Sequence, residues 1–360
     1  MKIRRVGAYG LCRDADGRVL LARNSAASEF PGRWGLPGGG VEQGEHPDDA
    51  VVREFAEETG LRVRVAGLRA VIADVARLPS SGALEHTDRI IYDVVVDGGT
   101  LRPEPDGTTD RVEWVAVAAG PDGTATAGPR TDPDASATAT AGPRTDPGAS
   151  VTATAGPRTD LGASVTATAG PRAEPGDGDR PLMPFTARIL GRAAPEPEDF
   201  DGEPDIRPEK PTRVQRFGAY AVATDPAGRI LLTRIATGYP GAGRWHLPGG
   251  GTDHGEAPED ALARELVEET SQRGRVTGLI GISHRHDPAA RGPEGVPVDW
   301  HVVRAMFRVR VEAPTPAVVT EAAGGSTAEA GWFTPAEAAA LPLTEVARSA
   351  VEGWAAEKVS

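Results

Sequence analysis

The chain of 360 residues contains the same domain-sized segment twice, and this duplication constrains its fold more than any local pattern does. GAYGLCRDADGRVLLAR begins at Gly7 and GAYAVATDPAGRILLTR begins at Gly218, an offset of 211 residues. Continued without a gap to Leu61 and Gln272, the two copies share 27 identities over 55 positions. A whole folding unit has been duplicated, and two domains are therefore expected, consistent with a usual size of roughly 150 residues per domain.

A shorter repeat interrupts the first copy. AGPRTDPDASATAT begins at Ala127 and recurs with a period of 14 residues, ending in a degenerate AGPRAEPGDGD. Ala, Thr, Gly and Pro dominate these units, so they offer too little apolar surface to offset the entropy lost on folding. We expect residues of about 120–179 to be disordered.

The position of these repeats predicts the domain boundaries. In the second copy, the strand that ends at Trp332 runs almost directly into the closing helix, whereas in the first copy Trp114 ends the strand and the matching RPLMPFTARILGRA begins only at Arg180. The repeats are thus an insertion within the first domain. The expected division is residues 1–192, a linker of residues 193–211 rich in proline and acidic side chains, which should be extended, and residues 212–360.

Deleting residues 124–179 should leave the first domain folded and active, because the closure entropy of a loop grows only logarithmically with its length. Thermal unfolding of the deletion variant should shift by a few degrees at most. An insoluble or inactive variant would show that the repeats carry structure.

Composition narrows the class of protein. The formal charge of −13 disfavours binding to nucleic acid or to anionic lipid. No apolar run approaches the ~18 residues of a spanning helix, and the basic N-terminus lacks the apolar segment of a signal peptide, since Val6 to Cys12 is expected to form a strand. Cys12 is the only cysteine, which excludes an intrachain disulfide. We expect a cytoplasmic protein without a nucleic-acid or membrane partner, and the sequence does not indicate its oligomeric state.

A cluster of acidic residues follows the glycine-rich segment LPGGG of the first copy. Pro47 suits the first turn of a helix and Gly60 suits a left-handed C-terminal cap, so a helix of about four turns is expected between them. Glu54, Glu57 and Glu58 are spaced by i+3 and i+4 and therefore converge on one face.

Such an acidic stripe is ordinarily a solvated helix face, but its position here favours a metal site. Glu58 lies roughly 20° from Val51 on a helical projection, at the edge of the apolar stripe rather than opposite it. Arg53, four residues before Glu57, is in the less favourable order for an ion pair and is not expected to neutralise the cluster alone. A hard divalent cation with oxygen ligands would resolve the repulsion, and sites that handle phosphate typically use Mg²⁺.

The 23 residues GGVEQGEHPDDAVVREFAEETGL, from Gly39, resemble the signature of Nudix hydrolases at every specified position. The resemblance implies an α+β fold, an α/β/α sandwich with a mixed β-sheet, in two copies. It also implies Mg²⁺- or Mn²⁺-dependent hydrolysis of a diphosphate linkage in a small-molecule nucleoside diphosphate derivative, such as a nucleoside triphosphate, ADP-ribose, a nucleotide sugar or a dinucleotide. In this resemblance Arg53 orients the glutamates, Glu45 supports the loop, and one glutamate acts as general base. The implied metal ligands are the Gly39 carbonyl, Glu54, Glu57 and Glu58.

The second copy, GGTDHGEAPEDALARELVEETSQ, keeps every chemical position of the signature. Ser271 and Gln272 replace a glycine and an aliphatic residue, which should weaken the helix end without removing a ligand. We expect this domain to bind metal, either for turnover or as a sensor that binds a nucleotide diphosphate without cleaving it. The positions concerned are Gly250, Glu256, Arg264, Glu265, Glu268 and Glu269.

The residues that recognise the substrate are harder to infer from the sequence. Related hydrolases often present a phosphate-binding Arg at the strand ends occupied here by Arg23 and Arg234, although exposed strand-end arginines are equally common; Arg33 and Arg244, which precede the glycine loops, are further candidates. Trp34 is expected in the core or cleft wall. The tetrad from His284 to Asp287 is expected in a polar loop, and Cys12 is poorly placed for the isomerase chemistry that the same fold supports. Residues on a later strand that could line the cleft are His86, Arg89 and Tyr92 in the first copy, and Trp300, His301 and Arg304 in the second.

Overall fold

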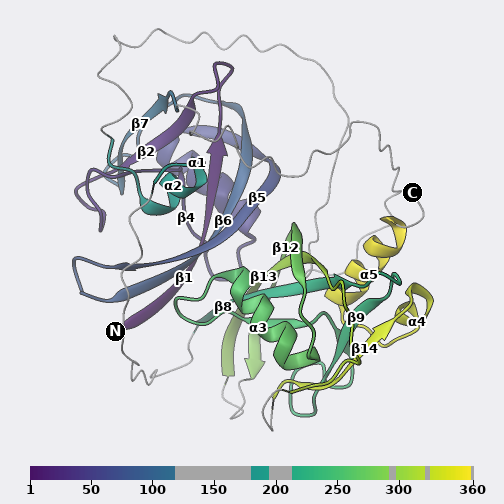
Figure 1. Cartoon of the computed structure of the whole chain (residues 1–360). Helices are drawn as coiled ribbons and strands as arrows, with labels where there is room; N and C mark the ends of the chain where they lie inside the picture. Colours follow the sequence, from purple (N-terminus) through teal and green to yellow (C-terminus); the bar gives the residue numbers. More distant parts are fainter. Residues whose placement is uncertain (118–179, 194–212, 292–296, 321–324, 358–360) are drawn as a thin grey trace.

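A computed structural model describes residues 1–117, 180–193, 213–291, 297–320 and 325–357 of the chain. It contains two domains of matching architecture, coloured purple to teal and green to yellow in Figure 1. The predicted disorder of the repeats and the predicted linker fall almost wholly outside the described residues.

The order of strands and helices is the same in the two copies up to the closing segment. The elements of domain 1 are β1 (Lys2–Cys12), β2 (Val19–Asn24), β3 (Trp34–Gly35), β4 (Gly38–Gly40), α1 (Pro47–Thr59), β5 (Leu61–Arg77), β6 (Leu84–Gly99), β7 (Thr109–Val115) and α2 (Pro184–Ile189). Those of domain 2 are β8 (Arg213–Thr224), β9 (Ile230–Ile235), β10 (Trp245–His246), β11 (Gly249–Gly251), α3 (Pro258–Thr270), β12 (Arg275–Arg291), β13 (Pro297–Arg310), β14 (Thr327–Phe333), α4 (Pro335–Ala339) and α5 (Glu345–Glu357).

Each domain is built on mixed sheets. In domain 1, β1 pairs with β6 in parallel and with β4 antiparallel, so Ala8 lies between Ile90 and Gly39 in a sheet of order β4-β1-β6-β5. A second sheet has the order β3-β2-β7. In domain 2 the corresponding strands join into one seven-stranded sheet, because β8 and β9 pair at Thr224 and Ile230. The expected α+β fold with mixed sheets is confirmed in both copies.

Helix α1 packs with its apolar face against the larger sheet of domain 1. Ala50, Val51 and Phe55 are all 0% exposed. Gly10 on β1 makes room for the Phe55 ring, since a Cβ at Gly10 would lie 2.4 Å from it. Burying a phenylalanine of this kind stabilises a fold by roughly 1.5–3 kcal/mol, so the adjoining, carboxylate-bearing edge of α1 is held in a fixed position against β4.

The chain that follows the repeats packs against domain 1. Leu182 forms a parallel bridge with Trp34, as Leu343 does with Trp245 in domain 2. Phe185, on α2, is buried in the same cluster as Trp34. The two copies thus close in the same way, although α2 has 6 residues and α5 has 13. The exact domain boundaries stay a prediction.

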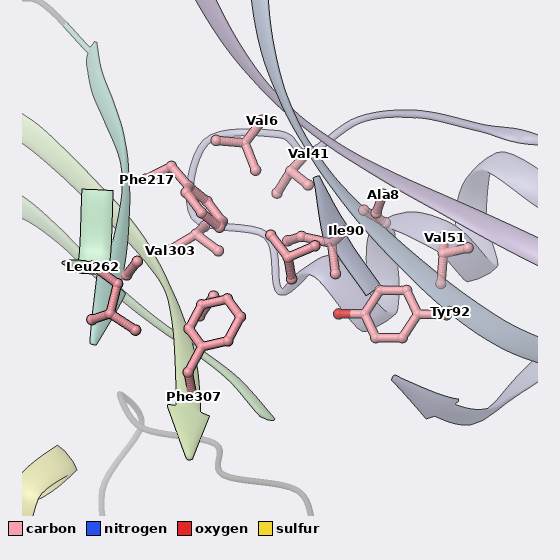
Figure 2. Close-up of a cluster of buried hydrophobic side chains, with 14 of the residues drawn as sticks. Val6, Ala8, Val41, Val51, Ile90, Tyr92, Phe217, Leu262, Val303 and Phe307 are labelled. Carbon is pink, nitrogen blue, oxygen red and sulfur yellow. The ribbon is translucent and has the colours of Figure 1, made fainter. Parts of the chain in front are cut away.

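The two domains share one hydrophobic cluster. Val6 and Val41 of domain 1 face Phe217 and Val303 of domain 2, as Figure 2 shows, and all four are at most 7% exposed. Phe217 and Val6 are counterparts in the duplication, one offset of 211 residues apart. The contact therefore joins equivalent surfaces of the two copies.

Candidate metal and nucleotide site

The loop and helix that carry the acidic cluster of domain 1 begin and end where the sequence predicts. Pro47 is the first residue of α1, and Gly60 caps it in the left-handed conformation, with φ 69° and ψ 3°. At the other end, the side chain of His46 accepts a hydrogen bond from the Asp48 amide at 3.1 Å. These caps satisfy helix-end backbone groups that would otherwise lack partners.

Arg53 organises most of the carboxylates. Its guanidinium donates to Glu45 at 2.9 Å, to Glu54 at 2.9 Å, to Glu57 at 3.1 Å and to the Gly40 carbonyl at 3.0 Å. One guanidinium reaches three carboxylates because its fork of donors spans the helix face and the loop, but its single positive charge cannot balance all of them. Hydrogen bonding to Glu45 also raises the pKa of Arg53.

Glu58 lies outside this network. Its carboxylate accepts hydrogen bonds from the Gly38 amide at 2.9 Å and from the Thr109 hydroxyl at 3.0 Å. Burial raises the pKa of Glu58 to about 8, with the nearby charge of Glu54 acting in the same direction and the Gly38 N–H opposing it. Burial also raises the pKa of Glu54, against the effect of Arg53. The negative charges of Glu54 and Glu58 are therefore only partly balanced by positive charge from the protein.

Domain 2 repeats the same contacts. Arg264 donates to Glu256 at 2.9 Å, to Glu265 at 3.0 Å and to Glu268 at 3.3 Å. Glu269 accepts from the Gly249 amide at 2.9 Å and from the Thr327 hydroxyl. The second copy thus preserves the polar geometry of the first.

The two departures from the signature in domain 2 are accommodated locally. Helix α3 keeps the 13 residues of α1, and Ser271 adopts the left-handed conformation, with φ 57°, while its hydroxyl donates to the Val318 carbonyl at 2.7 Å. Gln272 is 1% exposed, and its amide accepts from the Thr315 N–H at 3.0 Å and donates to the Thr315 hydroxyl at 2.9 Å. The lost aliphatic contact is replaced by satisfied hydrogen bonds.

The donor set fits a hard divalent cation. Carboxylate and carbonyl oxygens are the ligands that such ions prefer, and a Cβ at Gly39 would lie 2.6 Å from the Glu54 carboxylate, so this carboxylate rests against the loop backbone. Gly250 and Glu265 repeat the approach at 2.5 Å. Within the described part of the chain, no three His, Cys, Asp or Glu side chains form a group that could hold a metal ion. The carboxylates are turned instead towards Arg53 and the Gly38 amide.

In metal-free buffer, the stability of domain 1 should fall as the pH rises from about 4.5 to about 8. The pKa of Glu58 is raised from 4.5 to about 8 in the folded protein, so the unfolded chain loses this proton at a lower pH. Deprotonation of Glu58 therefore favours the unfolded state over the folded state. Glu58→Gln should flatten this slope, whereas Glu57→Gln, at a side chain that is 49% exposed, should not. Melting temperatures in EDTA at pH 5 and pH 8 measure the difference, and equal slopes in wild type and Glu58→Gln would contradict it.

The candidate phosphate-binding arginines lie at the surface. Arg23 pairs with Asp110 at 2.8 Å and Arg234 pairs with Glu329 at 2.8 Å. Asp110 adjoins Thr109, the hydroxyl partner of Glu58. The other two candidates, Arg33 and Arg244, are exposed beside their glycine loops.

The aromatic residues next to these loops belong to the core. Trp34 is 4% exposed and Trp245 is 7% exposed, as expected for core positions. Arg180 lies over the Trp34 ring at 4.6 Å.

Several residues that the sequence suggested for the cleft wall lie elsewhere. His86 and His301 are 0% exposed and contact the opposite domain. Tyr92 is in the shared hydrophobic cluster, and Arg89 is buried against Asp74 and the Tyr9 hydroxyl. In domain 2 the Trp300 ring lies beneath Arg216, whereas Arg304 interacts with Tyr220, close to Glu265 and Glu269, so its place at the cleft stays a prediction.

The prediction of a polar loop from His284 to Asp287 was wrong, because these residues lie within strand β12. On this strand His284 meets His46 and His286 lies against Gly44 at the domain interface, whereas the Arg285 side chain is exposed. Sequence reasoning also missed Thr109 and Thr327, the hydroxyl partners of Glu58 and Glu269. A signal was present, since each threonine precedes the tryptophan of its strand by five residues.

The fold and the site together define a protein of two mixed-sheet domains, each with a glycine loop followed by a carboxylate-bearing helix. The family described as the NUDIX domain matches residues 1–132 and 214–353, and the chain belongs to this family. None of the helices in the described ranges is long and apolar enough to cross a membrane.

Similar proteins match over one domain-sized segment or less. An "ADP-ribose pyrophosphatase" of Methanocaldococcus jannaschii is 38% identical over 93 residues, covering 26% of this chain and 52% of that protein. A "Nucleoside triphosphatase NudI" of Escherichia fergusonii is 50% identical over 54 residues, covering 15% and 32%. A "MutT-like protein" of Streptomyces ambofaciens is 39% identical over 90 residues, covering 23% and 56%. The match thus spans about half or less of these relatives.

Among solved structures, the MutT protein from Methanosarcina mazei Go1 has 20% identity and a TM-score of 0.33, covering 41% of this chain and 98% of its own. The NUDIX domain of Shewanella oneidensis NrtR, complexed with ADP ribose, has 19% identity and a TM-score of 0.33, covering 41% and 91%.

Proposed function

We propose that domain 1 hydrolyses the diphosphate linkage of a nucleoside diphosphate derivative in a reaction that requires Mg²⁺ or Mn²⁺. The observation that carries the proposal is the environment of Glu58: an enclosed carboxylate beside Glu54, with neutral hydrogen-bond donors and a pKa raised to about 8. A divalent cation supplies the missing positive charge and, when bound, neutralises a diphosphate and lowers the pKa of water.

The residues of domain 1 have three proposed roles: some hold the metal, some orient the loop and some bind the substrate. Arg53 and Glu45 fix the loop against the helix, and Arg23 and Arg33 would contact substrate phosphate. Arg23 would exchange its carboxylate partner Asp110 for the substrate. The proposed metal ligands are the Gly39 carbonyl, Glu54, Glu57 and Glu58, and in domain 2 the Gly250 carbonyl, Glu265, Glu268 and Glu269.

The names of the relatives point to two substrate classes, an ADP-ribose-like diphosphate and a nucleoside triphosphate. The purified full chain should be screened with Mg²⁺ against nucleoside triphosphates, ADP-ribose, nucleotide sugars and dinucleotides, with separation of the nucleotide and phosphate products. Mg²⁺-dependent cleavage of one class is the expected result. Undiminished cleavage in excess EDTA, or none in the whole panel, would contradict the proposal. These substrates are consistent with a cytoplasmic location.

A second candidate for domain 2 is a sensor that binds a nucleotide diphosphate without cleaving it. Ser271 replaces the cap glycine and Gln272 replaces the aliphatic residue, which favours a role for this domain that differs from that of domain 1. The contacts of Arg264, Glu256 and Glu269 are nevertheless kept. Calorimetry of Mg²⁺ binding to Glu269→Gln, in a chain whose domain 1 carries Glu57→Gln and Glu58→Gln, tests both roles. Unchanged Mg²⁺ affinity would mean that the second motif is no longer a site. Weaker affinity without any product from domain 2 would assign the sensor.

A further inference from the structure

Each signature loop, residues 41–46 in domain 1 and residues 252–257 in domain 2, donates a backbone hydrogen bond to a histidine of the opposite domain. The Gly44 amide donates to Nδ1 of His301 at 3.2 Å, and the Gly255 amide donates to Nδ1 of His86 at 2.7 Å. Gly44 and Gly255 are one offset of 211 residues apart. The two contacts are therefore equivalent by the duplication.

The two histidines also occupy equivalent places. His86 on β6 lies opposite Arg4 of β1, and His301 on β13 lies opposite Gln215 of β8, the counterpart of Arg4. Arg4 donates to the carbonyl of Thr252 in the domain 2 loop, and Gln215 donates to the carbonyl of Val41 in the domain 1 loop, at 3.0 Å for Gln215. The interface between the domains is consequently self-complementary, as in a symmetric dimer.

The hydrogen bonds fix the tautomer of each imidazole. A backbone N–H can only donate, so Nδ1 of both histidines must carry a lone pair and the proton must lie on Nε2. In His86 this proton faces Asp88 Oδ1 at 3.0 Å, and Asp88 is in turn paired with Arg4 at 3.1 Å. In His301 it faces Nδ1 of His284 at 3.2 Å. Each acceptor is thus oriented by a further residue.

His301, the domain 2 residue that accepts the Gly44 amide of domain 1, is uncharged at neutral pH. Burial, together with the nearby His284 and His286, lowers the pKa of His301 to about 4, against the opposite effect of Asp299 and Glu45. Its Nδ1 therefore carries the lone pair that accepts the Gly44 amide at 3.2 Å, and the Gln215 side-chain amide lies 3.2 Å from the same nitrogen.

The contacted glycine amides lie next to the site. Gly44 precedes Glu45, whose carboxylate holds the Arg53 guanidinium through bonds at 2.9 and 3.0 Å, and Arg53 in turn contacts Glu54 and Glu57. In domain 2 the same succession runs from Gly255 through Glu256 to Arg264. Residues that orient the partners of metal ligands influence metal affinity and activity strongly.

We propose that each domain positions the signature loop of the other, His301 acting on domain 1 and His86 acting on domain 2. Both histidines are positioning residues that never touch the substrate. The consequence for turnover rests on the proposed function, whereas the consequence for the loops does not.

Hydrogen exchange of the glycine amides in the full chain tests the loop contacts directly. In His301→Ala, exchange of the Gly44 amide should accelerate about tenfold while the Gly255 amide changes little, and His86→Ala should give the opposite pattern. His301→Asn and His86→Asn, which restore an acceptor near the Nδ1 position, should recover most of the protection. Arg285→Ala is the control, because Arg285 lies on the neighbouring strand β12 with an exposed side chain that pairs with Asp287 and not with a loop.

Turnover and Mg²⁺ affinity then test the crossed effect. With domain 2 silenced by Glu268→Gln and Glu269→Gln, His301→Ala should lower kcat and Mg²⁺ affinity roughly 10- to 100-fold with a smaller change in KM, and His86→Ala should have a weaker effect. With domain 1 silenced by Glu57→Gln and Glu58→Gln, the Mg²⁺ affinity of domain 2 should depend on His86 instead. If both loops respond equally to each variant, the histidines only pack the interface and the proposal is overturned. Unchanged hydrogen exchange at both glycine amides would also overturn it. Absence of hydrolysis and of Mg²⁺ binding in the parent chains would refute the proposed function alone, since the exchange pattern would still decide the loop contacts.

Discussion

Replacing Glu57 and Glu58 together by glutamine is expected to reduce hydrolysis by domain 1 to background while the domain stays folded. Glutamine keeps the size of each side chain, and at position 58 its carbonyl oxygen can still accept the Gly38 amide while its NH2 group donates to the Thr109 hydroxyl oxygen. It removes the two charges that would hold a divalent cation. The measurement is product formation with saturating Mg²⁺, in a chain whose domain 2 carries Glu268→Gln and Glu269→Gln so that only one site reports.

Glu29→Gln is a suitable control for this experiment, because Glu29 is a carboxylate bound to Ser80 away from the acidic cluster. It should retain full turnover. Retention of turnover in the double variant, with an unchanged dependence on Mg²⁺, would show that the reaction does not use these carboxylates.

Gly60→Ser should destabilise domain 1 by roughly 2–5 kcal/mol, the sum of a left-handed non-glycine residue and an overpacked site. A Cβ at Gly60 would lie 2.5 Å from the Thr100 carbonyl, which is backbone and cannot move aside cheaply. Chemical denaturation of the full chain should show a lower midpoint for Gly60→Ser than for wild type, with domain 2 also losing stability to the extent that it depends on the shared hydrophobic cluster.

The matched exchange in the second copy should behave differently. Ser271→Gly relieves the left-handed conformation, a gain of up to roughly 1 kcal/mol, but it also removes the hydrogen bond from the Ser271 hydroxyl to the Val318 carbonyl at 2.7 Å, which is worth about 1 kcal/mol. We expect a change within about 1 kcal/mol of zero. A loss in Ser271→Gly as large as that in Gly60→Ser would mean that the two helix ends are held by other contacts.

The elements that carry strong local signals were predictable from sequence. The extent of α1 follows from Pro47 and Gly60, since each has a backbone preference that suits one end of a helix. Glu58 at the edge of the apolar stripe was predictable from helical periodicity, and it is the enclosed carboxylate of the structure. The duplication predicted that the two copies have the same fold.

Tertiary contacts between distant segments were not predictable in the same way. His86 and His301 were expected to line the cleft of their own domain, because nothing in the sequence links them to partners that lie 169 and 257 residues away in the chain. The strand that contains His284 and His286 was not predictable, because four consecutive polar residues show no apolar alternation and two of them pack on the opposite domain. The reach of Arg53 depends on how closely β4 and α1 approach, which no spacing along the chain records.

The histidines at the interface show what joining two copies in one chain makes possible. His46 meets His284 with ring centroids 4.8 Å apart, and His284 meets His301 at 5.4 Å. The counterpart of His46 in the second copy is Ala257, and the counterpart of His284 across the duplication is Ala73.

In a dimer of identical subunits every substitution appears on both sides of the axis, so a histidine group of this kind would be built twice or not at all. A covalent pair is freed from that constraint, and its two halves also meet at an effective concentration set by the tether rather than by the amount of protein in solution. One half of the interface can therefore acquire a group of histidines while the equivalent positions of the other half keep small apolar residues, and dilution does not separate the two domains.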